Sequence, residues 1–433
     1  MTSPARSRVV DALARAAAAF PDLGPQTLET TKLTPADARL ALAIHRTTLQ
    51  RWVTLRFLVE RHTRGKQLGR MQPSLQAVLL TATAQLLFFD KAADHAVVSE
   101  SVDMAKALVR KDAGSLVNAV LRRVIADRQG IEPEPWQPAA DLAPHPAGRL
   151  RFNSPVFPPL DELDRYLAFA TSHPRKLVQR WLTTFGADAT AAICHHNTLN
   201  PPTLLLQAGS CPQDPDSAES LPESTPWTGT HDELVAHLAA HPGDRVQDPA
   251  AALPVCSTRG LDPKLIVDAC AGRGTKTRQL ATLHPGATII ASDIDATRFA
   301  DLRKGFAGQP NVRVTPYPEL PMQGVDLLLL DVPCSNSAVL ARRPEARYRL
   351  SPQSLASVSQ LQRDILAKLV PGVAPGGHLL YATCSLEHEE NRAAINRVLR
   401  ERPGTLVHDR LVLPSRVGEP YHDGSYHALV RFE

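Results

Sequence analysis

Apolar positions in the first 125 residues recur at spacings of three and four. This period places apolar side chains on one face of a helix, so it predicts a series of amphipathic helices. The segments that carry it are RVVDALARAAAAF, ADARLALAIHRTTLQRWVTLRFLVERH, LQAVLLTATAQLLFF, HAVVSESVDMAKAL and SLVNAVLRRVI. We therefore expect an all-helical domain over residues 1–125, with its last helix opened by Asp112 or Ser115.

A different pattern begins near residue 246, where short apolar runs alternate with helical segments. The runs are LIVDACA, ATIIASD, VDLLLLDVP and HLLYATCS, and two further candidate strands, LVHDRLVL and YHALVRFE, close the chain. Apolar strands with intervening helices are typical of a parallel, doubly wound sheet. We expect residues 241–433 to form a Rossmann-like α/β domain with its ligand at the carboxyl ends of the strands.

The stretch between these two patterns, residues 126–240, is less regular. Residues 126–160 contain eight prolines and no sustained period, which indicates a linker or an irregular, packed connection. Residues 174–198 return to a helical pattern, and the polar, proline-rich residues 209–228 predict an exposed loop. We interpret the stretch as a linker and a small intermediate segment.

Positive charge is concentrated in the helical part. The net charge of the chain is +4, but residues 1–125 hold 18 Lys and Arg against 10 Asp and Glu. A basic cluster lies between two of the predicted helices and comprises Arg56, Arg61, Arg64, Lys66 and Arg70. This asymmetry fits a polyanion-binding domain on an enzyme body, and it fits equally a solvated helical surface without a partner.

The remaining composition restricts the class of protein. No apolar run approaches the roughly 20 residues that cross a bilayer, and the basic N-terminus lacks a cleavage signal, so we expect a cytoplasmic protein. No two of the six cysteines have CxxC spacing, which argues against a zinc site, and we expect no metal. Without a secretion signal, we expect no disulfide framework either.

Two polar sites follow neighbouring predicted strands. The loop of DACAGRGTKT carries Gly272 and Gly274 before a helix, an arrangement that lets a ligand approach the backbone closely. Asp293 ends the next strand, where a carboxylate suits ribose hydroxyls. Together they predict a nucleoside cofactor without separating NAD from S-adenosylmethionine. A plain tight connection and a helix-capping Asp293 are the structural alternatives.

Two cysteines hold matching positions after two later strands. Cys334 stands in DVPCS, after Asp331, and Cys384 stands in YATCS. Parallel strands would bring both thiols to one cleft, and a thiolate is a strong nucleophile towards carbon. The structural alternative is a pair of inert buried thiols.

These motifs together resemble the Sun or RsmB-type family of bacterial 16S ribosomal RNA cytosine-C5 methyltransferases. That family joins a NusB-like helical RNA-binding domain to a Rossmann-like methyltransferase domain. The matching segments are VQDPAA, DACAGRGTKT, LLLDVPCS, ARRPEARYRL, APGGHLLYATCS, EEN and DGSYHALV, with LLFFDKAADHAVVSESVDMAKAL and SLVNAVLRRV upstream. The paired PC and TC motifs are highly specific. The resemblance implies a monomeric enzyme that methylates 16S rRNA with S-adenosylmethionine.

The resemblance also implies roles for single residues. Cys384 would be the nucleophile, Cys334 would assist product release, and Asp331 would lie beside the base and stabilise the activated ring. The residues implied to line the cofactor pocket are Cys270, Ala271, Gly272, Arg273, Gly274, Thr275, Lys276, Asp293 and Asp331. The residues implied to lie near the RNA are Arg342, Arg347 and Tyr348.

The cofactor loop departs from the family pattern AAPGGKT. Arg273 replaces the proline, and Thr275 replaces a glycine whose freedom at positive φ it cannot share. In the family an Asp often follows the third strand of the sheet. The corresponding segment here, TPYPELP, offers only Glu319. Two alternatives therefore stay open: a non-catalytic RNA-binding or assembly factor, and the same chemistry on tRNA. The sequence does not specify the target nucleotide.

Overall fold

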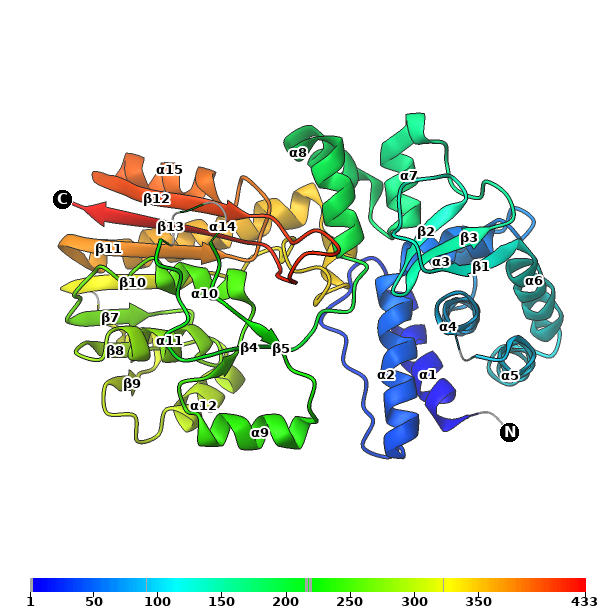
Figure 1. Cartoon of the computed structure of the whole chain (residues 1–433), viewed down its shortest axis with the longest axis horizontal. Coiled ribbons are helices and arrows are strands. Elements are labelled where there is room, and N and C mark those ends of the chain that lie inside the picture. Colours follow the sequence, from blue (N-terminus) through cyan, green and yellow to red (C-terminus); the bar gives the residue numbers. More distant parts are fainter. Residues whose placement is uncertain (1–2, 91, 215–216, 218–219, 322) are drawn as a thin grey trace. The chain divides into compact units, whose positions relative to one another are not determined.

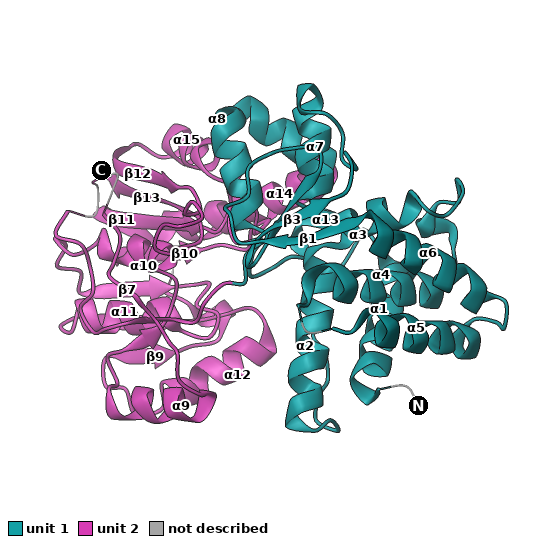
Figure 2. Ribbon diagram, turned by 45° about the vertical axis from the view of Figure 1, so that its right-hand side comes forward, with its two compact units in different colours: residues 1–200, 340–350 teal, residues 201–339, 351–433 magenta. Residues whose placement is uncertain are grey.

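The computed structural model describes residues 3–90, 92–214, 217, 220–321 and 323–433, and its elements are labelled in Figure 1. The chain divides into two compact units (Figure 2). Unit 1 contains Met1–Asn200 and Leu340–Leu350, and unit 2 contains Pro201–Val339 and Ser351–Glu433. The expected intermediate segment 126–240 is therefore not a unit of its own, because its first part packs in unit 1 and its last part in unit 2.

Unit 1 begins with the predicted helices. They are α1 (Pro4–Ala19), α2 (Pro35–Gln50), α3 (Trp52–Glu60), α4 (Pro73–Phe88), α5 (Asp94–Leu108) and α6 (Ala113–Asp127). Every residue of α4 from Leu75 to Phe88 is buried, as expected for a helix that is apolar on all sides. The prediction of an all-helical N-terminal domain is confirmed, and Asp112 is the N-cap residue of α6.

The interpretation of residues 126–160 as a linker or irregular connection is wrong, because they contain an antiparallel sheet of order β1-β3-β2. Its strands are β1 (Arg128–Glu132), β2 (Leu142–His145) and β3 (Gly148–Phe152). In β3, Leu150 and Phe152 are buried, while Arg149 and Arg151 pair with Glu132. Such short strands offer too few alternations to signal a strand against the prolines around them. Helices α7 (Leu163–Ala170) and α8 (Arg175–His196) follow, the latter as predicted.

Unit 2 is built on a seven-stranded sheet of order β12-β13-β11-β10-β7-β8-β9. The strands are β7 (Leu265–Asp268), β8 (Thr288–Ala291), β9 (Val312–Val314), β10 (Val325–Asp331), β11 (Val373–Thr383), β12 (Gly404–Val412) and β13 (Ser425–Phe432). The pairs from β9 to β11 are parallel, and β13 pairs antiparallel with β11 and β12. The doubly wound fold is confirmed, and the three-residue β9 is the strand that the pattern did not predict.

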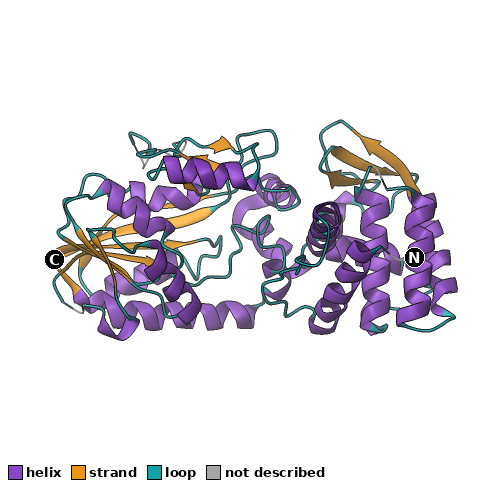
Figure 3. Ribbon diagram, turned by 90° about the horizontal axis from the view of Figure 1, so that it is seen from below, coloured by secondary structure: helices purple, strands orange, loops and turns teal. Residues whose placement is uncertain are grey.

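Helices cover both faces of this sheet (Figure 3). They are α10 (Pro249–Cys256), α11 (Thr275–Leu283), α12 (Ala296–Gly305), α14 (Pro352–Leu369) and α15 (Arg392–Glu401). Alternate residues of β10 pack against the helices on the two faces of the sheet. Leu327 and Leu329 pack with α10, α11 and α12, whereas Leu328 and Leu330 pack with α14 and α15. Burial on both faces explains why β10 is a continuous apolar run.

A small sheet of order β5-β4-β6 precedes the large one in unit 2. It comprises β4 (Leu204–Leu206), β5 (Thr225–Pro226) and β6 (Arg245–Val246), and α9 (His231–Ala240) lies between β5 and β6 in the chain. Part of the predicted loop 209–228 lies outside the described residues. A disulfide joins Cys211 to Cys256, which corrects the expectation of no disulfide. Chain folding rather than spacing decides that pairing, since 45 residues separate the two cysteines.

Among the residues described, no helix has both the length and the apolar character that crossing a membrane requires.

Candidate active site

Two thiols converge just beyond the carboxyl ends of β10 and β11. These strands are parallel neighbours in which Asp331 is opposite Ala382. Cys334 lies three residues beyond the end of β10 and Cys384 one residue beyond the end of β11, and their Sγ atoms are 3.0 Å apart. The expected convergence of both thiols on one site is therefore observed.

The loop after β10 also supplies a polar partner for the second cysteine. The Cys384 thiol lies 3.2 Å from Asn336 Oδ1, to which it donates. Asn336 has a left-handed backbone with φ 63°, a conformation that asparagine tolerates better than most residues. This turn returns the chain towards the thiols, because Ala338 N donates to the carbonyl of Cys384 at 3.1 Å.

An ion pair stands beside the thiols. Lys276 in α11 contacts Asp331, with Nζ 2.7 Å from Oδ2. Burial alone would lower the pKa of Lys276, but the Asp331 carboxylate and negative charge at Cys384 and Asp268 outweigh it, so the pKa is raised. Lys276 is therefore a stable cation that holds Asp331 beside the thiols.

The two sulfurs are not equivalent. The hydrogen bond with Cys384, followed by burial, raises the pKa of Cys334 well above its usual value. Cys334 therefore stays a thiol at neutral pH and can donate a hydrogen bond to the Cys384 sulfur. Burial raises the pKa of Cys270 as well, which excludes that cysteine as a nucleophile.

Glu390 holds the two cysteine loops together, a function that the sequence pattern did not reveal. Its carboxylate accepts hydrogen bonds from the amide of Ser335 at 2.8 Å and from the hydroxyls of Ser335 and Ser385. Gln362 in α14 donates a further bond at 3.0 Å. Ser335 and Ser385 directly follow the two cysteines, so one buried carboxylate fixes the spacing of both loops. The signal was present in the EEN motif, which carried no assigned role.

The cofactor loop keeps glycine where the backbone requires it. Gly272 has φ +60° and Gly274 has φ +85°, and Gly274 forms the N-cap of α11. A Cβ at Gly274 would lie 2.2 Å from the ring of Phe306, so this glycine also permits close packing. Thr275 is the first residue of α11 and has no positive φ. The replacement of glycine by Thr275 therefore leaves the conformation of the loop intact. The expectation that position 275 needs a glycine's freedom at positive φ is corrected.

Two carboxylates, Asp293 and Asp268, form hydrogen bonds with the cofactor loop and the helix after it. Asp293 accepts a hydrogen bond from the amide of Gly272 at 2.9 Å. Asp293 is not the N-cap of α12, because Asp295 caps that helix. Asp268 is buried, and its pKa is raised by burial to about 7. One of its carboxylate oxygens bonds Thr277, and the other has no partner among the described residues.

This geometry suits a nucleoside cofactor with a charged amino-acid end. A Cβ at Gly272 would meet nothing within 4 Å, so open space lies over the loop backbone. The unpartnered oxygen of Asp268 is an acceptor for an ammonium or a hydroxyl. Arg273 does not obstruct the loop, because its exposed side chain pairs with Asp301 at 3.1 Å. The residues present therefore fit S-adenosylmethionine.

The three residues expected near the RNA have different environments within unit 1. Arg347 is fully buried and donates to five main-chain carbonyls, those of Gln50, Thr171, Ser172, Asn197 and Leu340. Tyr348 is also buried and donates to the carbonyl of Leu49 at 2.7 Å. Their expected contact with RNA does not fit this burial, because the terminal nitrogens of Arg347 already bond main-chain carbonyls and organise the surrounding loops instead, although its Nε has no partner among the described residues. Arg342 is exposed.

Comparisons with known proteins identify two regions of the chain. Residues 260–417 match the family model of the 16S rRNA methyltransferase RsmB/F, and residues 3–126 match the NusB family. The chain is 30% identical over 386 residues to ribosomal RNA small subunit methyltransferase B of Vibrio cholerae, covering 84% of this chain and 83% of that protein.

Two further comparisons extend over most of the chain. It is 25% identical over 390 residues to the probable ribosomal RNA small subunit methyltransferase B of Bacillus subtilis, covering 82% of this chain and 78% of that protein. The crystal structure of PH0851 aligns with a TM-score of 0.66 at 19% identity and covers 99% of each chain. At that identity the structural likeness shows the fold alone.

Proposed function

The chain belongs to the RsmB/F family of 16S rRNA methyltransferases, and from this we propose that it methylates carbon 5 of a cytosine in 16S ribosomal RNA. The proposed methyl donor is S-adenosylmethionine. The observation that carries the proposal is the pair of thiols 3.0 Å apart, with the Lys276–Asp331 ion pair beside them. A non-catalytic assembly factor would have no use for this arrangement.

The chemistry explains why a thiolate is required. Carbon 5 of cytosine is too weak a nucleophile to accept a methyl group unaided. Addition of the Cys384 sulfur to carbon 6 forms an S–C bond and moves the ring's double-bond electrons onto carbon 5. In this proposal Lys276 holds Asp331 beside the thiols, and Asp331 stabilises the activated ring. The base must leave its stack to reach these residues.

Release reverses the addition. After methylation, carbon 5 loses its proton to a base, the double bond re-forms and the bond between sulfur and carbon 6 breaks. Cys334 is protonated and adjacent to the departing sulfur, so its thiol can donate a hydrogen bond to the leaving thiolate. The glutamate that binds both serines keeps the two sulfurs at this spacing.

Loop residues around Gly272, with Asp268 and Asp293, would hold the cofactor, which when bound supplies an electrophilic methyl group. Asp293→Ala is expected to weaken binding of S-adenosylmethionine by about 1–3 kcal/mol, the scale of lost hydrogen bonds to a charged group. Isothermal titration calorimetry measures this difference. No binding by the unmodified protein at millimolar cofactor would favour the assembly-factor interpretation.

The covalent step is tested by trapping. In Cys334→Ala, the Cys384 thiol is expected to add to the cytosine and the methyl group to be transferred. The variant should then stall before the bond between sulfur and carbon 6 breaks. It should accumulate an RNA–protein species that survives denaturing electrophoresis and disappears after ribonuclease treatment. Cys384→Ala should form no such species. Adduct from Cys384→Ala but not from Cys334→Ala would exchange the two roles, and none from either, with an active wild type, would remove the covalent mechanism.

The substrate is tested by bisulfite sequencing of total RNA from cells with and without this protein. The proposal expects one protected cytosine in 16S rRNA to become convertible when the protein is absent. A change confined to tRNA would assign the same chemistry to another substrate. Unit 1 is the proposed RNA-binding region, because Arg61, Arg64, Lys66 and Arg70 are exposed on it.

A further inference from the structure

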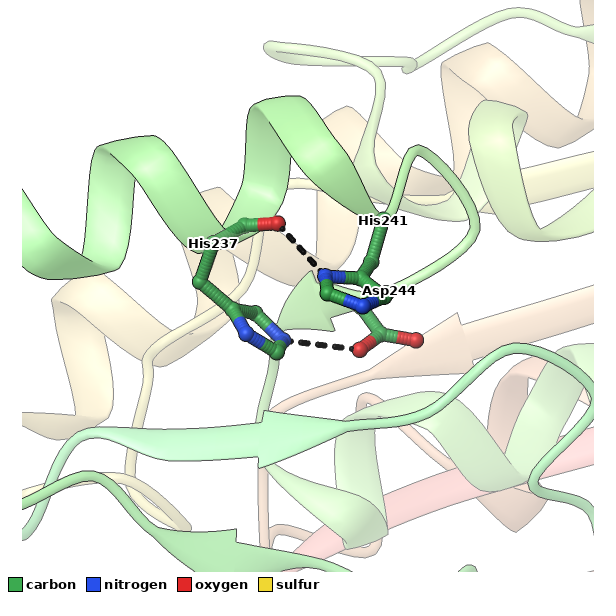
Figure 4. A group of neighbouring side chains, drawn as sticks. All are labelled: His237, His241 and Asp244. Carbon is green, nitrogen blue, oxygen red and sulfur yellow. Dashed lines mark hydrogen bonds and ion pairs between the residues drawn. The ribbon is translucent and has the colours of Figure 1, made fainter.

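The end of α9 and the turn after it bring two imidazoles and a carboxylate together (Figure 4). His237 and His241 are four residues apart, which places their rings on one side of the helix, with centroids 4.4 Å apart. Asp244 precedes β6, and its Oδ2 lies 2.9 Å from His237 Nε2. Within the described part of the chain, this is the one group of three or more His, Cys, Asp or Glu side chains with metal-ligating atoms within 4.8 Å of one another.

The hydrogen bonds around the group prepare its ligand atoms. His241 Nδ1 lies 3.0 Å from the carbonyl of His237, and a carbonyl can only accept, so Nδ1 carries the proton. The neutral ring therefore presents an unprotonated Nε2. Histidine ligands of metals usually have this arrangement, in which the second ring nitrogen donates to a carbonyl or carboxylate.

The carboxylate is also held in place. Asp244 Oδ1 accepts a hydrogen bond from the amide of Ala208 at 3.0 Å, which leaves Oδ2 directed at His237. Its side chain is 12% exposed, so few alternative positions are open to it. A metal ion would replace the proton that His237 and Asp244 now share, as metal ions commonly do when they bind imidazole.

We propose that His237, His241 and Asp244 form a binding site for a divalent transition-metal ion of the zinc type. Two imidazole nitrogens and one carboxylate oxygen are a ligand set that Zn²⁺ accepts, with water in the fourth position. Bonds of about 2.0 Å require tetrahedral ligand atoms roughly 3.3 Å apart. The His237–Asp244 pair, now 2.9 Å apart, must therefore open slightly, and any longer separation within the group must shorten. His241 is exposed, so its ring has room to make this movement.

The ion would act as a structural clamp. It would tie the end of α9 to the turn before β6 and, through Asp244, to the residues after β4. The clamp borders the cofactor loop, because Asp244 lines a cavity of about 520 Å³ together with Arg273, Gly274 and Thr275. The proposal is nevertheless independent of the methyltransferase assignment, since it rests on these three side chains.

The experiment measures zinc binding to the chelator-treated, full-length protein by calorimetry. The catalytic thiols are a competing zinc ligand pair, so each measurement is made on the wild type and on the Cys334→Ser/Cys384→Ser protein. We expect one equivalent of zinc that persists without those thiols. His241→Ala should lower the affinity of this equivalent at least about tenfold. His231→Ala, an exposed histidine at the start of the same helix, is the matched control and should leave it unchanged.

A second measurement follows the metal where it binds. The Trp227 ring lies 5.4 Å from that of His237, so Cu²⁺ at this site should quench its fluorescence. The quenching should be lost in His241→Ala and in Asp244→Asn, which keeps the acceptor for Ala208 but weakens ligation. Equal zinc affinity and equal quenching in the wild type, His241→Ala and Asp244→Asn would overturn the proposal, as would no zinc bound to the thiol-free protein at millimolar concentration.

Discussion

Unit 1 and unit 2 each contain a polar cluster built from motif residues, and the two clusters have different chemistry. In unit 1, the terminal nitrogens of Arg347 donate hydrogen bonds to main-chain carbonyls, which cannot react or change charge. In unit 2, Cys334, Cys384, Lys276 and Asp331 contact one another through groups that can gain or lose protons. Hydrogen bonds to the main chain alone indicate a structural residue, whereas mutually polarising side chains indicate a reactive site.

The comparison also separates two kinds of motif. ARRPEARYRL and the PC and TC motifs all contribute to the family resemblance, yet the first supplies packing and the others supply thiols. A motif therefore identifies the family before it identifies the role of any residue. Four variants test this distinction between structural and reactive residues, and they are ordered from the largest expected effect to the smallest.

Cys384→Ala should have the largest effect and should act on chemistry alone. Methyl transfer should fall at least about a thousandfold, the scale on which enzymes lose an essential nucleophile. The melting temperature should stay close to that of the wild type, because the thiol is partly exposed. Transfer of tritium from labelled cofactor to RNA measures the first quantity and calorimetry the second. Substantial remaining methylation would show that the thiol pair is not the reactive cluster.

Arg347→Met should show the opposite behaviour. Loss of its donors leaves several buried carbonyls without partners, which should lower the free energy of unfolding by about 2–4 kcal/mol. Urea denaturation measures this loss. Arg343→Met, an exposed neighbour, is the control and should be near neutral. If Arg347→Met kept full stability and lost only RNA affinity, Arg347 would be an RNA contact after all.

Glu390→Gln should have the third-largest effect and should act on the rate. The variant keeps the volume of the side chain but places an amide where the serine hydroxyls need an acceptor. We expect kcat to fall about tenfold to a hundredfold through misplaced sulfurs, with little change in KM for the cofactor. Glu389→Gln, on the exposed neighbouring residue, is the control. A purely structural role would lower stability and leave the rate of adduct formation in the folded protein unchanged.

Arg64→Gln/Lys66→Gln should have the smallest effect. Removal of each phosphate-binding side chain should reduce the dependence of RNA affinity on salt concentration by roughly one unit of slope, so the double variant should lose about two. Filter binding at several salt concentrations provides the slope. The control pair is Lys32→Gln/Arg39→Gln, which removes the same charge from exposed positions outside the basic cluster. Equal salt-dependence slopes for the two double variants would show that the basic cluster is a solvated surface that does not bind RNA.

Much of the fold could be predicted because its signals are local. A period of three to four identified the N-terminal helices, and long apolar runs identified β7, β8, β10 and β11, since burial on both faces requires apolar residues throughout. The convergence of Cys334 and Cys384 followed from strand order, because neighbouring parallel strands end at one edge of a sheet. The sheet β1-β3-β2 was missed, because strands of four or five residues offer too few alternations to stand out against the prolines around them.

What the sequence by itself determined is the class of fold, the strand ends at which the thiols and carboxylates lie, and the family to which their spacing belongs. Only the tertiary structure decided which polar residues are partners. It paired Cys211 with Cys256, buried Arg347 among carbonyls, placed Thr275 in a helical conformation and joined both thiol loops through Glu390. The reason is physical: periodicity and spacing describe the chain near each residue, whereas hydrogen bonds and burial depend on segments that meet only after folding.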